Sequence, residues 1–179
     1  MSAATTPSNS MDRWQDFRTN TGQSLGELAT QSPVLVVFLR HGGCPFCHTV
    51  LQKVRDERPQ LEKQGLRLVL THLMSDQDAI ELFVPYGLAD LPRISDPTAQ
   101  LYQLLGMKKG TAWQIAGPST WLRGAYQTLT QGKLPKLGKG DIFQLPGVSL
   151  LQGDRIVRSY AAKDSADTPD LEQFACPIA

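Results

Sequence analysis

The sequence feature that most constrains the fold is an apolar run that ends at a pair of glycines and a pair of cysteines. The residues from Val34 to Leu39 are all β-branched, aromatic or leucine, which is typical of a strand buried on both faces. Gly42-Gly43 breaks the run, and Cys44-Pro45-Phe46-Cys47 follows directly. Apolar residues then recur at helical spacing, as Phe46, Val50, Leu51, Val54 and Leu61. The pattern predicts a buried strand, a tight turn, and a helix that opens with two cysteines.

The middle of the chain predicts a second strand and two further helices. Leu66–Leu70 is expected to form a second central strand. Ser75 and Asp78 have the spacing of a capping box at the start of a helix. Asp96-Pro97 is expected to supply the N-cap and the first-turn proline of another helix, which stops at Gly106.

Three other segments complete the predicted elements. In the helix after the cysteines, Pro59 is expected to cause a kink or an end. Near the C-terminus, Gly147–Leu151 and Arg155–Tyr160 flank Gly153-Asp154, which predicts a β-hairpin. One or two short helices are expected within residues 14–28, and a last short helix at about 169–174.

The order of these elements predicts an α/β architecture. Strands and helices alternate early, which implies parallel strands joined by right-handed crossovers, and the late hairpin adds antiparallel strands to the same sheet. We therefore expect a central mixed sheet flanked by helices. Residues 1–12 are expected to form a disordered tail. Residues 13–179 are expected to form one domain, with a helical insertion at 107–140 before the final hairpin.

Composition and charge exclude several classes of protein. The 179 residues are 41% hydrophobic, which is ordinary for a single globular domain. A formal net charge of +1 gives no field that favours nucleic acid or an anionic membrane. No basic start with an apolar stretch is visible at the N-terminus, and no apolar run is long enough to span a bilayer, so a cytoplasmic location is expected. In a reducing compartment, two cysteines three residues apart are more often redox-active or metal-binding than structural.

The two cysteines lie where a helix can activate a thiol. Unpaired N–H groups and the dipole at a helix N-terminus stabilise the thiolate, which is the reactive form. Pro45 suits the first helical turn, where no N–H is required. Cys44, nearer the helix end, is expected to be the nucleophile, and Cys47 the resolving thiol that attacks a mixed disulfide on the first sulfur. The alternative is that both are inert, buried side chains.

Three groups of residues occur in an order that resembles a known family. They are Leu39-Arg40-His41-Gly42-Gly43-Cys44-Pro45-Phe46-Cys47; Ser95-Asp96-Pro97 with Leu101-Tyr102 and Leu105-Gly106; and Phe143-Gln144-Leu145-Pro146-Gly147-Val148 with Gly153 and Arg158. Over roughly residues 33–160, they resemble the peroxiredoxin-like branch of the alkyl hydroperoxide reductase and thiol-specific antioxidant superfamily. The resemblance implies a thioredoxin-like fold and a dithiol redox protein.

The resemblance and the local sequence suggest residues that orient a substrate. Pro146, just before a predicted strand, is expected to have a cis peptide bond, with an ordinary trans proline as the alternative. In thioredoxin folds such a proline faces the dithiol and leaves backbone groups free to pair with a substrate. His41 is a candidate for tuning the thiolate or relaying a proton, with a solvated loop histidine as the alternative. Arg40 and Arg158 are candidates for a cation near the thiols.

The chain departs from true peroxiredoxins at two positions. Peroxiredoxins place a threonine three residues before the peroxidatic cysteine and bring an arginine from a later strand. If Cys47 is peroxidatic, Cys44 stands at the threonine position and Pro146 at about the arginine position. We therefore expect thiol–disulfide exchange through Cys44 and Cys47. A thiol-dependent peroxidase using the same pair, or a non-catalytic redox sensor, is the alternative.

The partners expected for such a dithiol protein are small redox molecules or other proteins. We expect a protein or low-molecular-weight thiol or disulfide, a hydroperoxide in the peroxidase case, and an electron donor such as thioredoxin or glutathione. No nucleic acid or membrane partner is expected.

Other uses of the cysteines are weaker, and no cofactor or metal is expected. The residues from Cys44 to His48 match the c-type haem attachment pattern, but no export signal is visible. A zinc site needs two further ligands, and no second Cys/His pair accompanies the three histidines. An iron–sulfur cluster shared between two chains is the remaining metal alternative. His72 is expected to be structural, and Cys176 a packed or surface thiol, with resolution of a sulfenic acid as its alternative role.

Overall fold

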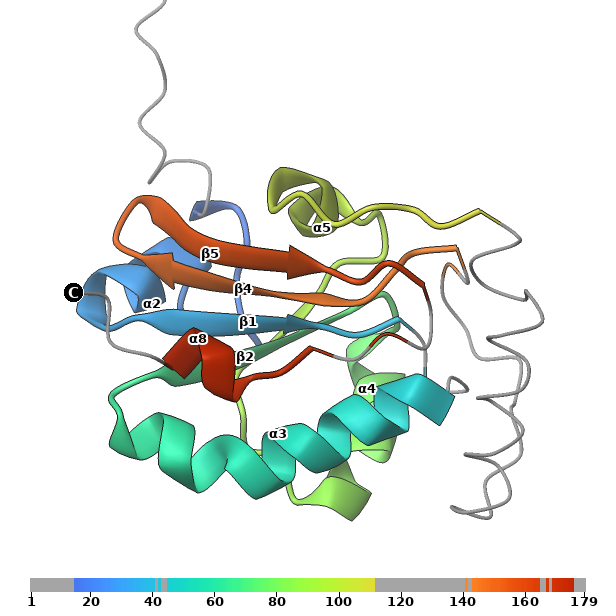
Figure 1. Ribbon diagram of the computed structural model, residues 1–179, viewed down its shortest axis with the longest axis horizontal. Coiled ribbons are helices and arrows are strands. Elements are labelled where there is room, and N and C mark those ends of the chain that lie inside the picture. Colours follow the sequence, from blue (N-terminus) through green and yellow to red (C-terminus); the bar gives the residue numbers. More distant parts are fainter. Residues whose placement is uncertain are drawn as a thin grey trace, which may run out of the picture.

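The computed structural model describes residues 15–40, 42, 45–111, 141, 143–164, 167 and 169–175. The elements follow one another as α2 (Leu25–Gln31), β1 (Val34–Phe38), α3 (Pro45–Lys63), β2 (Arg67–His72), α4 (Asp76–Phe83), η1 (Val84–Tyr86), β3 (Arg93–Ser95), α5 (Gln100–Leu104), β4 (Gly147–Gln152), β5 (Arg155–Ala161) and α8 (Glu172–Ala175) (Figure 1). The predictions for residues 1–12 and 112–140, and for His41, Cys44 and Cys176, fall outside the described residues.

The five strands form one mixed sheet in the order β3-β2-β1-β4-β5. β1 pairs in parallel with β2, and β2 with β3, whereas β4 is antiparallel to both β1 and β5. In the central strand, Val36 lies between Val69 of β2 and Ser149 of β4. The predicted mixed sheet, with parallel strands first and a hairpin last, is confirmed.

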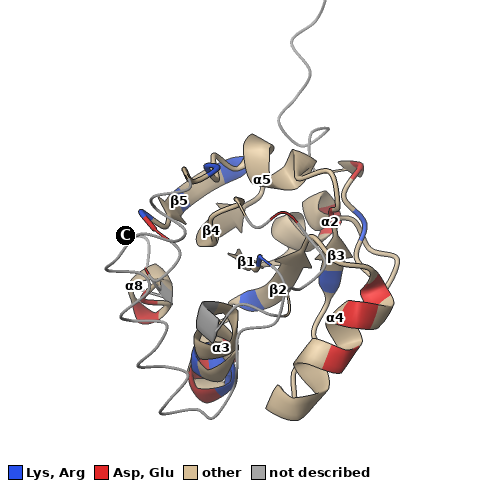
Figure 2. Ribbon diagram, turned by 90° about the vertical axis from the view of Figure 1, so that its right-hand side faces the viewer, with Lys and Arg blue, Asp and Glu red and all other residues tan. Residues whose placement is uncertain are grey.

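Helices cover both faces of this sheet. α3 and α4 lie on one face, and α2 and α5 on the other, as the two views agree (Figures 1 and 2). All five residues of β1 are buried. Leu35 and Val37 pack into the core under α3 and α4, whereas Val34 and Val36 pack with α2 and α5. Burial on both faces explains why β1 is apolar throughout. Because β1 is packed on both sides, the position of its last residue, Phe38, is well defined, and the segment that carries the cysteines follows it in the chain.

The helix starts were predicted with mixed success. Ser75 caps α4 as expected, since its Oγ accepts a hydrogen bond from the N–H of Asp78 at 3.2 Å. The expected N-cap at Asp96 is wrong, because α5 begins only at Gln100. A turn closed by the bond from Ala99 N–H to the Asp96 carbonyl comes first. The Asp96 carboxylate still stabilises the start of α5, since it accepts hydrogen bonds from the N–H groups of Gln100 and Leu101 at 3.0 and 2.8 Å.

Pro59 does not end α3. The helix continues through it to Lys63. Pro59 is exposed, so the carbonyl of Arg55, which loses its intrahelical donor, lies on the side of the helix that faces water. Within the described parts of the chain, neither α3 nor any other helix combines the length and the apolar composition needed to cross a membrane.

The chain returns to the sheet close to where it leaves after α5. Lys109 and Gln144 form an isolated antiparallel bridge, and the N–H of Gly110 donates to the Phe143 carbonyl at 2.7 Å. Lys109 also pairs with Asp141 at 2.8 Å. The described residues on either side of 112–140 therefore lie against each other before β4 begins.

Candidate active site

The first turn of α3 places Cys47 against the end of β1. The Cys47 side chain is 2% exposed, and the backbone N–H of Arg40 donates to its Sγ at 3.4 Å. Pro45 is the first residue of the helix, as predicted. The predicted passage from a buried strand into a helix that carries Cys47 is thus confirmed. Cys44 precedes α3 in the sequence, but neither it nor His41 is among the described residues.

A buried tyrosine joins the strand ends next to this cysteine. The hydroxyl of Tyr102 donates to the carbonyl of Leu39, and it lies 3.1 Å from the carbonyl of Thr71. Its ring packs edge-on against Phe38, with 4.7 Å between centroids. Burial, and after it the nearby Cys47, raises the pKa of Tyr102 well above its ordinary value. The hydroxyl therefore stays protonated and holds the ends of β1 and β2 together beneath the cysteine.

Replacing Tyr102 with phenylalanine should lower the free energy of unfolding by about 1–2 kcal/mol, because the buried Leu39 carbonyl loses its hydroxyl donor. Chemical denaturation measures the change. Tyr160→Phe is the matched control: Tyr160 is only partly buried on β5 and its hydroxyl bonds to one partly exposed side chain, that of Asp167, so its loss should cost less, about 0.5–1 kcal/mol. Equal losses in the two variants would show that the Tyr102 hydroxyl has no special role.

The structure corrects the prediction for Pro146. The Leu145–Pro146 peptide bond is trans, since no cis bond occurs among the described residues. The Pro146 carbonyl accepts a hydrogen bond from Ala162 N–H at 3.0 Å, so this backbone group is used within the chain's own hairpin and is not left for a substrate. Gly147 is opposite Phe38 in the sheet register. Pro146 therefore lies at the same end of the sheet as Arg40 and Cys47.

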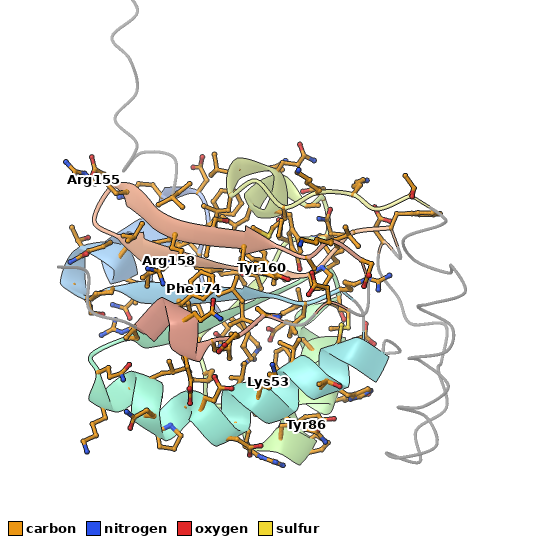
Figure 3. The ribbon with its side chains drawn as sticks, in the orientation of Figure 1. Lys53, Tyr86, Arg155, Arg158, Tyr160 and Phe174 are labelled. Atoms are coloured by element: carbon orange, nitrogen blue, oxygen red, sulfur yellow. The ribbon has the colours of Figure 1, made fainter. Side chains whose placement is uncertain are left out.

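The two candidate arginines differ in their surroundings. Arg158 is bound elsewhere, because its guanidinium donates to the Gln173 carbonyl and lies 5.9 Å from the centroid of the Phe174 ring (Figure 3). Arg40 is 3% exposed and adjoins Cys47 through its backbone. The pKa of Asp141 lies below its ordinary value, chiefly through the bond from Lys109 and in smaller part through the charge of Arg40. Of the two arginines, Arg40 alone is shown beside the thiol site.

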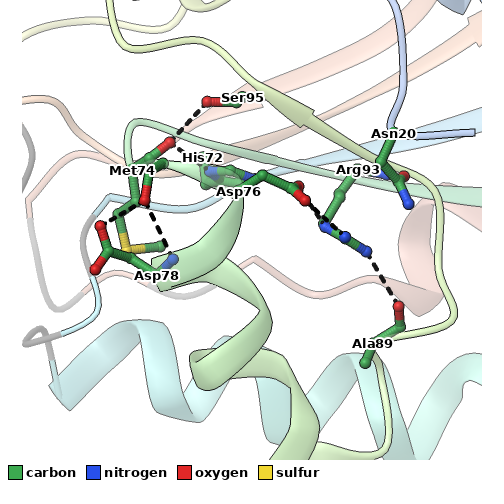
Figure 4. A network of polar contacts seen from close by, with 9 residues as sticks. Asn20, His72, Met74, Asp76, Asp78, Ala89, Arg93 and Ser95 are labelled. Atoms are coloured by element: carbon green, nitrogen blue, oxygen red, sulfur yellow. Dashed lines mark hydrogen bonds and ion pairs between the residues drawn. The ribbon is translucent and has the colours of Figure 1, made fainter. Parts of the chain in front are cut away.

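His72 belongs to a structural network beside the site, as expected from the sequence. Its side chain is fully buried, and Nδ1 lies 3.1 Å from the Met74 carbonyl, which also accepts from Ser95 (Figure 4). Burial lowers the pKa of His72 to about 4, so the ring is neutral at pH 7. Arg93 binds the Asp76 carboxylate through two bonds of 2.6 and 2.9 Å. These contacts fix the start of α4 against β3.

Other features of the described residues lie away from Cys47. No group of three His, Cys, Asp or Glu side chains suited to a metal comes together within the described ranges. Two surface cavities, both lined by Ser32, lie at the opposite end of β1 from Cys47. The first turn of α3 is the candidate active site because it holds Cys47 against the Arg40 N–H.

Comparisons with known proteins agree with the fold. A family model described as AhpC/TSA antioxidant enzyme matches residues 53–164. The chain is 23% identical over 163 residues to the prostamide/prostaglandin F synthase of Danio rerio, which covers 87% of this chain and 80% of that protein. Two solved structures are also similar, each with a TM-score of 0.60. PrxQ of Xylella fastidiosa is 15% identical, and the match covers 89% of this chain and 84% of that chain. Peroxiredoxin 6 of Arenicola marina is 14% identical, and the match covers 89% of this chain and 66% of that chain.

These likenesses differ in what they cover. The chain spans 66% of the Arenicola marina peroxiredoxin chain, which is just under two thirds. The family match begins at residue 53, after Cys47, so it rests on the elements that follow the two cysteines. The structural likeness shows the thioredoxin-like peroxiredoxin fold.

Proposed function

Because the chain belongs to the AhpC/TSA antioxidant enzyme family, and is thus an oxidoreductase, we propose that it is a thiol-dependent peroxidase acting through Cys44 and Cys47. The observation that carries this proposal is the buried Cys47 in the first turn of α3, with the Arg40 N–H directed at its sulfur. The family match favours the peroxidase over general disulfide exchange, which reverses the order expected from the sequence.

The proposed reaction has two chemical steps. The Cys44 thiolate attacks the terminal oxygen of a hydroperoxide; an S–O bond forms and the O–O bond breaks. The leaving alkoxide takes up the proton that the Cys44 thiol had released and departs as the alcohol, or as water from hydrogen peroxide. Cys44 is then a sulfenic acid. The Cys47 sulfur attacks the Cys44 sulfur, which forms a disulfide, breaks the S–O bond and releases water. Two electrons have passed to the peroxide, and an external thiol such as thioredoxin or glutathione returns them with two protons.

Burial supports this division of roles between the cysteines. A thiol that is 2% exposed is poorly accessible to a hydroperoxide from solvent, but it can react with a sulfur three residues away in its own chain. The N–H of Arg40 stabilises negative charge on Cys47 as it attacks, and again as it leaves when the disulfide is reduced. We assign Pro45 and His41 to the orientation of the thiol pair, and Pro146 to packing at the same end of the sheet.

The test is hydroperoxide consumption in the presence of a thiol reductant, run beside the reduction of a protein disulfide such as that of insulin. We expect the peroxide to be consumed much faster than the protein disulfide is reduced, and Cys44→Ser to abolish consumption. The matched control is Cys176→Ser, which should consume peroxide like the unmodified protein. Faster reduction of the protein disulfide would favour the exchanger. A reversible disulfide with neither activity would favour a redox sensor.

A second candidate substrate class comes from the curated relative. The likeness to the fish prostamide/prostaglandin F synthase covers 87% of this chain, a larger share than the family model matches. We therefore propose oxygenated lipids of the prostaglandin class as an alternative substrate. In that case the two electrons and two protons of the dithiol would open an O–O bridge into two hydroxyl groups. A panel of hydrogen peroxide, an alkyl hydroperoxide and a cyclic lipid peroxide separates the two, because only the lipid candidate predicts a strong preference for the cyclic compound.

A further inference from the structure

One peptide group after the end of β1 connects Tyr102 with the sulfur of Cys47. The Tyr102 hydroxyl donates to the Leu39 carbonyl, and the N–H of the same Leu39–Arg40 peptide donates to the Cys47 Sγ at 3.4 Å. We propose that Tyr102 is a positioning residue for the thiol, which acts through this peptide to direct the Arg40 N–H at the sulfur and to strengthen that hydrogen bond. The inference rests on the proposed use of Cys44 and Cys47 as a reacting pair.

The geometry of the peptide suits this connection. The Leu39–Arg40 bond is trans, since no cis bond occurs in the part of the chain that the structure describes. In a planar trans peptide, the C=O and N–H bonds point in opposite directions. The hydroxyl therefore approaches the peptide from one side, and the sulfur lies on the other. A hydroxyl that fixes the direction of the Leu39 carbonyl also fixes the direction of the Arg40 N–H.

The connection runs from one face of the sheet to the other. Tyr102 belongs to the core cluster that includes residues of α2 and α5, whereas Cys47 belongs to the cluster under α3 and α4. Figure 1 shows α5 and α3 on opposite faces. The Thr71 carbonyl near the hydroxyl accepts the N–H of Leu39 at 2.8 Å, so the one hydroxyl proton serves the Leu39 carbonyl. After burial, Cys47 is the largest influence that raises the pKa of Tyr102, which places the two side chains within electrostatic reach.

The exclusion of water lets the two hydrogen bonds influence each other. Tyr102 and Leu39 are fully buried, and Arg40 and Cys47 nearly so. In such surroundings, a hydrogen bond accepted by a carbonyl polarises the amide and strengthens its N–H as a donor, by about 10–30% per bond. A stronger donor favours the thiolate of Cys47. While a thiol is mostly protonated, this gain in thiolate outweighs the accompanying loss of nucleophilicity, so the Cys47 sulfur attacks faster.

The test follows the thiol pair with the aryl disulfide DTNB at about pH 6, where an unperturbed thiol is mostly protonated, in a Cys176→Ser background. Cys44 attacks first and releases one aryl thiolate at a rate proportional to the reagent concentration. Cys47 then attacks the Cys44 sulfur; the protein disulfide forms, and the second aryl thiolate leaves at a rate independent of the reagent concentration. Tyr102→Phe should slow the second release about threefold and change the first by less than about twofold.

No peroxide takes part in this measurement. Failure of the peroxidase assay would therefore refute the proposed function and leave the DTNB result valid. An unchanged second release in folded Tyr102→Phe overturns the positioning role.

Two controls separate the action of the hydroxyl from a loss of stability. Gly65→Ala strains a left-handed backbone position just before β2, at the end of the sheet where Arg67 is paired with Val34, far from the cysteine. Tyr160→Phe removes a hydroxyl that bonds to Asp167. Both variants should release the second aryl thiolate at the rate of the parent. Equal slowing in Gly65→Ala and Tyr102→Phe overturns the proposal, because stability alone would then explain the effect.

A variant at the sulfur end keeps the proposal testable if Tyr102→Phe does not fold. Cys47→Ala retains the Tyr102 hydroxyl and removes the sulfur that accepts the Arg40 N–H. In the NMR spectrum, the resonance of the hydroxyl-bearing ring carbon of Tyr102 should shift in Cys47→Ala, whereas that of Tyr160 should stay in place. A Tyr102 resonance that does not move overturns the connection through the peptide.

Discussion

Replacing Cys47 with serine is expected to stop the peroxide reaction at a sulfenic acid on Cys44. In the proposed sequence Cys47 is needed only for the second step, so the first oxidation still occurs. Serine is nearly the same size as cysteine, and its Oγ can accept the Arg40 N–H that now reaches the Cys47 sulfur. The buried end of β1 should therefore remain intact. The expected change is a shift from an intramolecular disulfide to a persistent sulfenic acid.

The measurement is a single turnover without reductant, because a small thiol can reduce a sulfenic acid directly and hide the loss of Cys47. One equivalent of hydroperoxide should remove two thiols from the unmodified protein and one from Cys47→Ser. A dione probe for sulfenic acid should label Cys44 nearly completely in the variant and hardly at all in the parent. Cys176→Ser is the control and should lose two thiols. Rapid loss of two thiols in Cys47→Ser would show that another cysteine resolves the intermediate.

Replacing Gly147 with alanine is expected to have the largest effect on stability, with a loss of about 3 kcal/mol in the free energy of unfolding. A Cβ at this position would lie closer than 3.0 Å to the Met107 sulfur and to the backbone oxygen of Tyr160. The methionine can move at some cost. The Tyr160 oxygen cannot, because it belongs to the paired strand β5. Since Gly147 lies opposite Phe38, strain here also reaches the strand that leads to Cys47.

Gly65→Ala is the matched control for this prediction. Gly65 has a φ of +83°, and a Cβ there meets nothing within 4 Å. Alanine at this position carries only the cost of the left-handed backbone, about 1 kcal/mol. Denaturant unfolding of both variants separates the crowding at Gly147 from a general intolerance of alanine. A loss for Gly147→Ala no greater than that for Gly65→Ala would contradict the packing described at the start of β4.

The parts of the fold that were predicted from sequence depend on local patterns. The apolar run of β1 and the Gly153-Asp154 turn between β4 and β5 each carry their signal within a few neighbouring residues. β3 was missed, because three residues are too few to show a period and the strand exists through its pairing with β2, as Arg93 with Leu70. At Pro146 the alternative of an ordinary trans bond holds, and the bond from Ala162 N–H to the Pro146 carbonyl could not be read from the local sequence.

The candidate site, too, was predicted from sequence only where local patterns carry the signal. The place of Cys47 at the start of a helix followed from the sequence around it. The contacts of Tyr102 and Tyr86 did not, because Tyr102 bonds to Leu39 across 63 residues and Tyr86 meets His48 across 38. A tyrosine in a helical pattern looks like any other core residue until its hydroxyl partner is known. The contact of Tyr102 shows that long-range pairing decides which hydroxyl lies near the thiol.

The most direct measurement of the central claim is peptide mapping by mass spectrometry after one equivalent of hydroperoxide. The account predicts that the peptide holding residues 44–47 becomes lighter by two hydrogen atoms, as Cys44 and Cys47 join, while Cys176 stays available to a thiol label. A peptide that keeps both thiols reduced while the peroxide disappears, or a bond from either cysteine to Cys176, would contradict it.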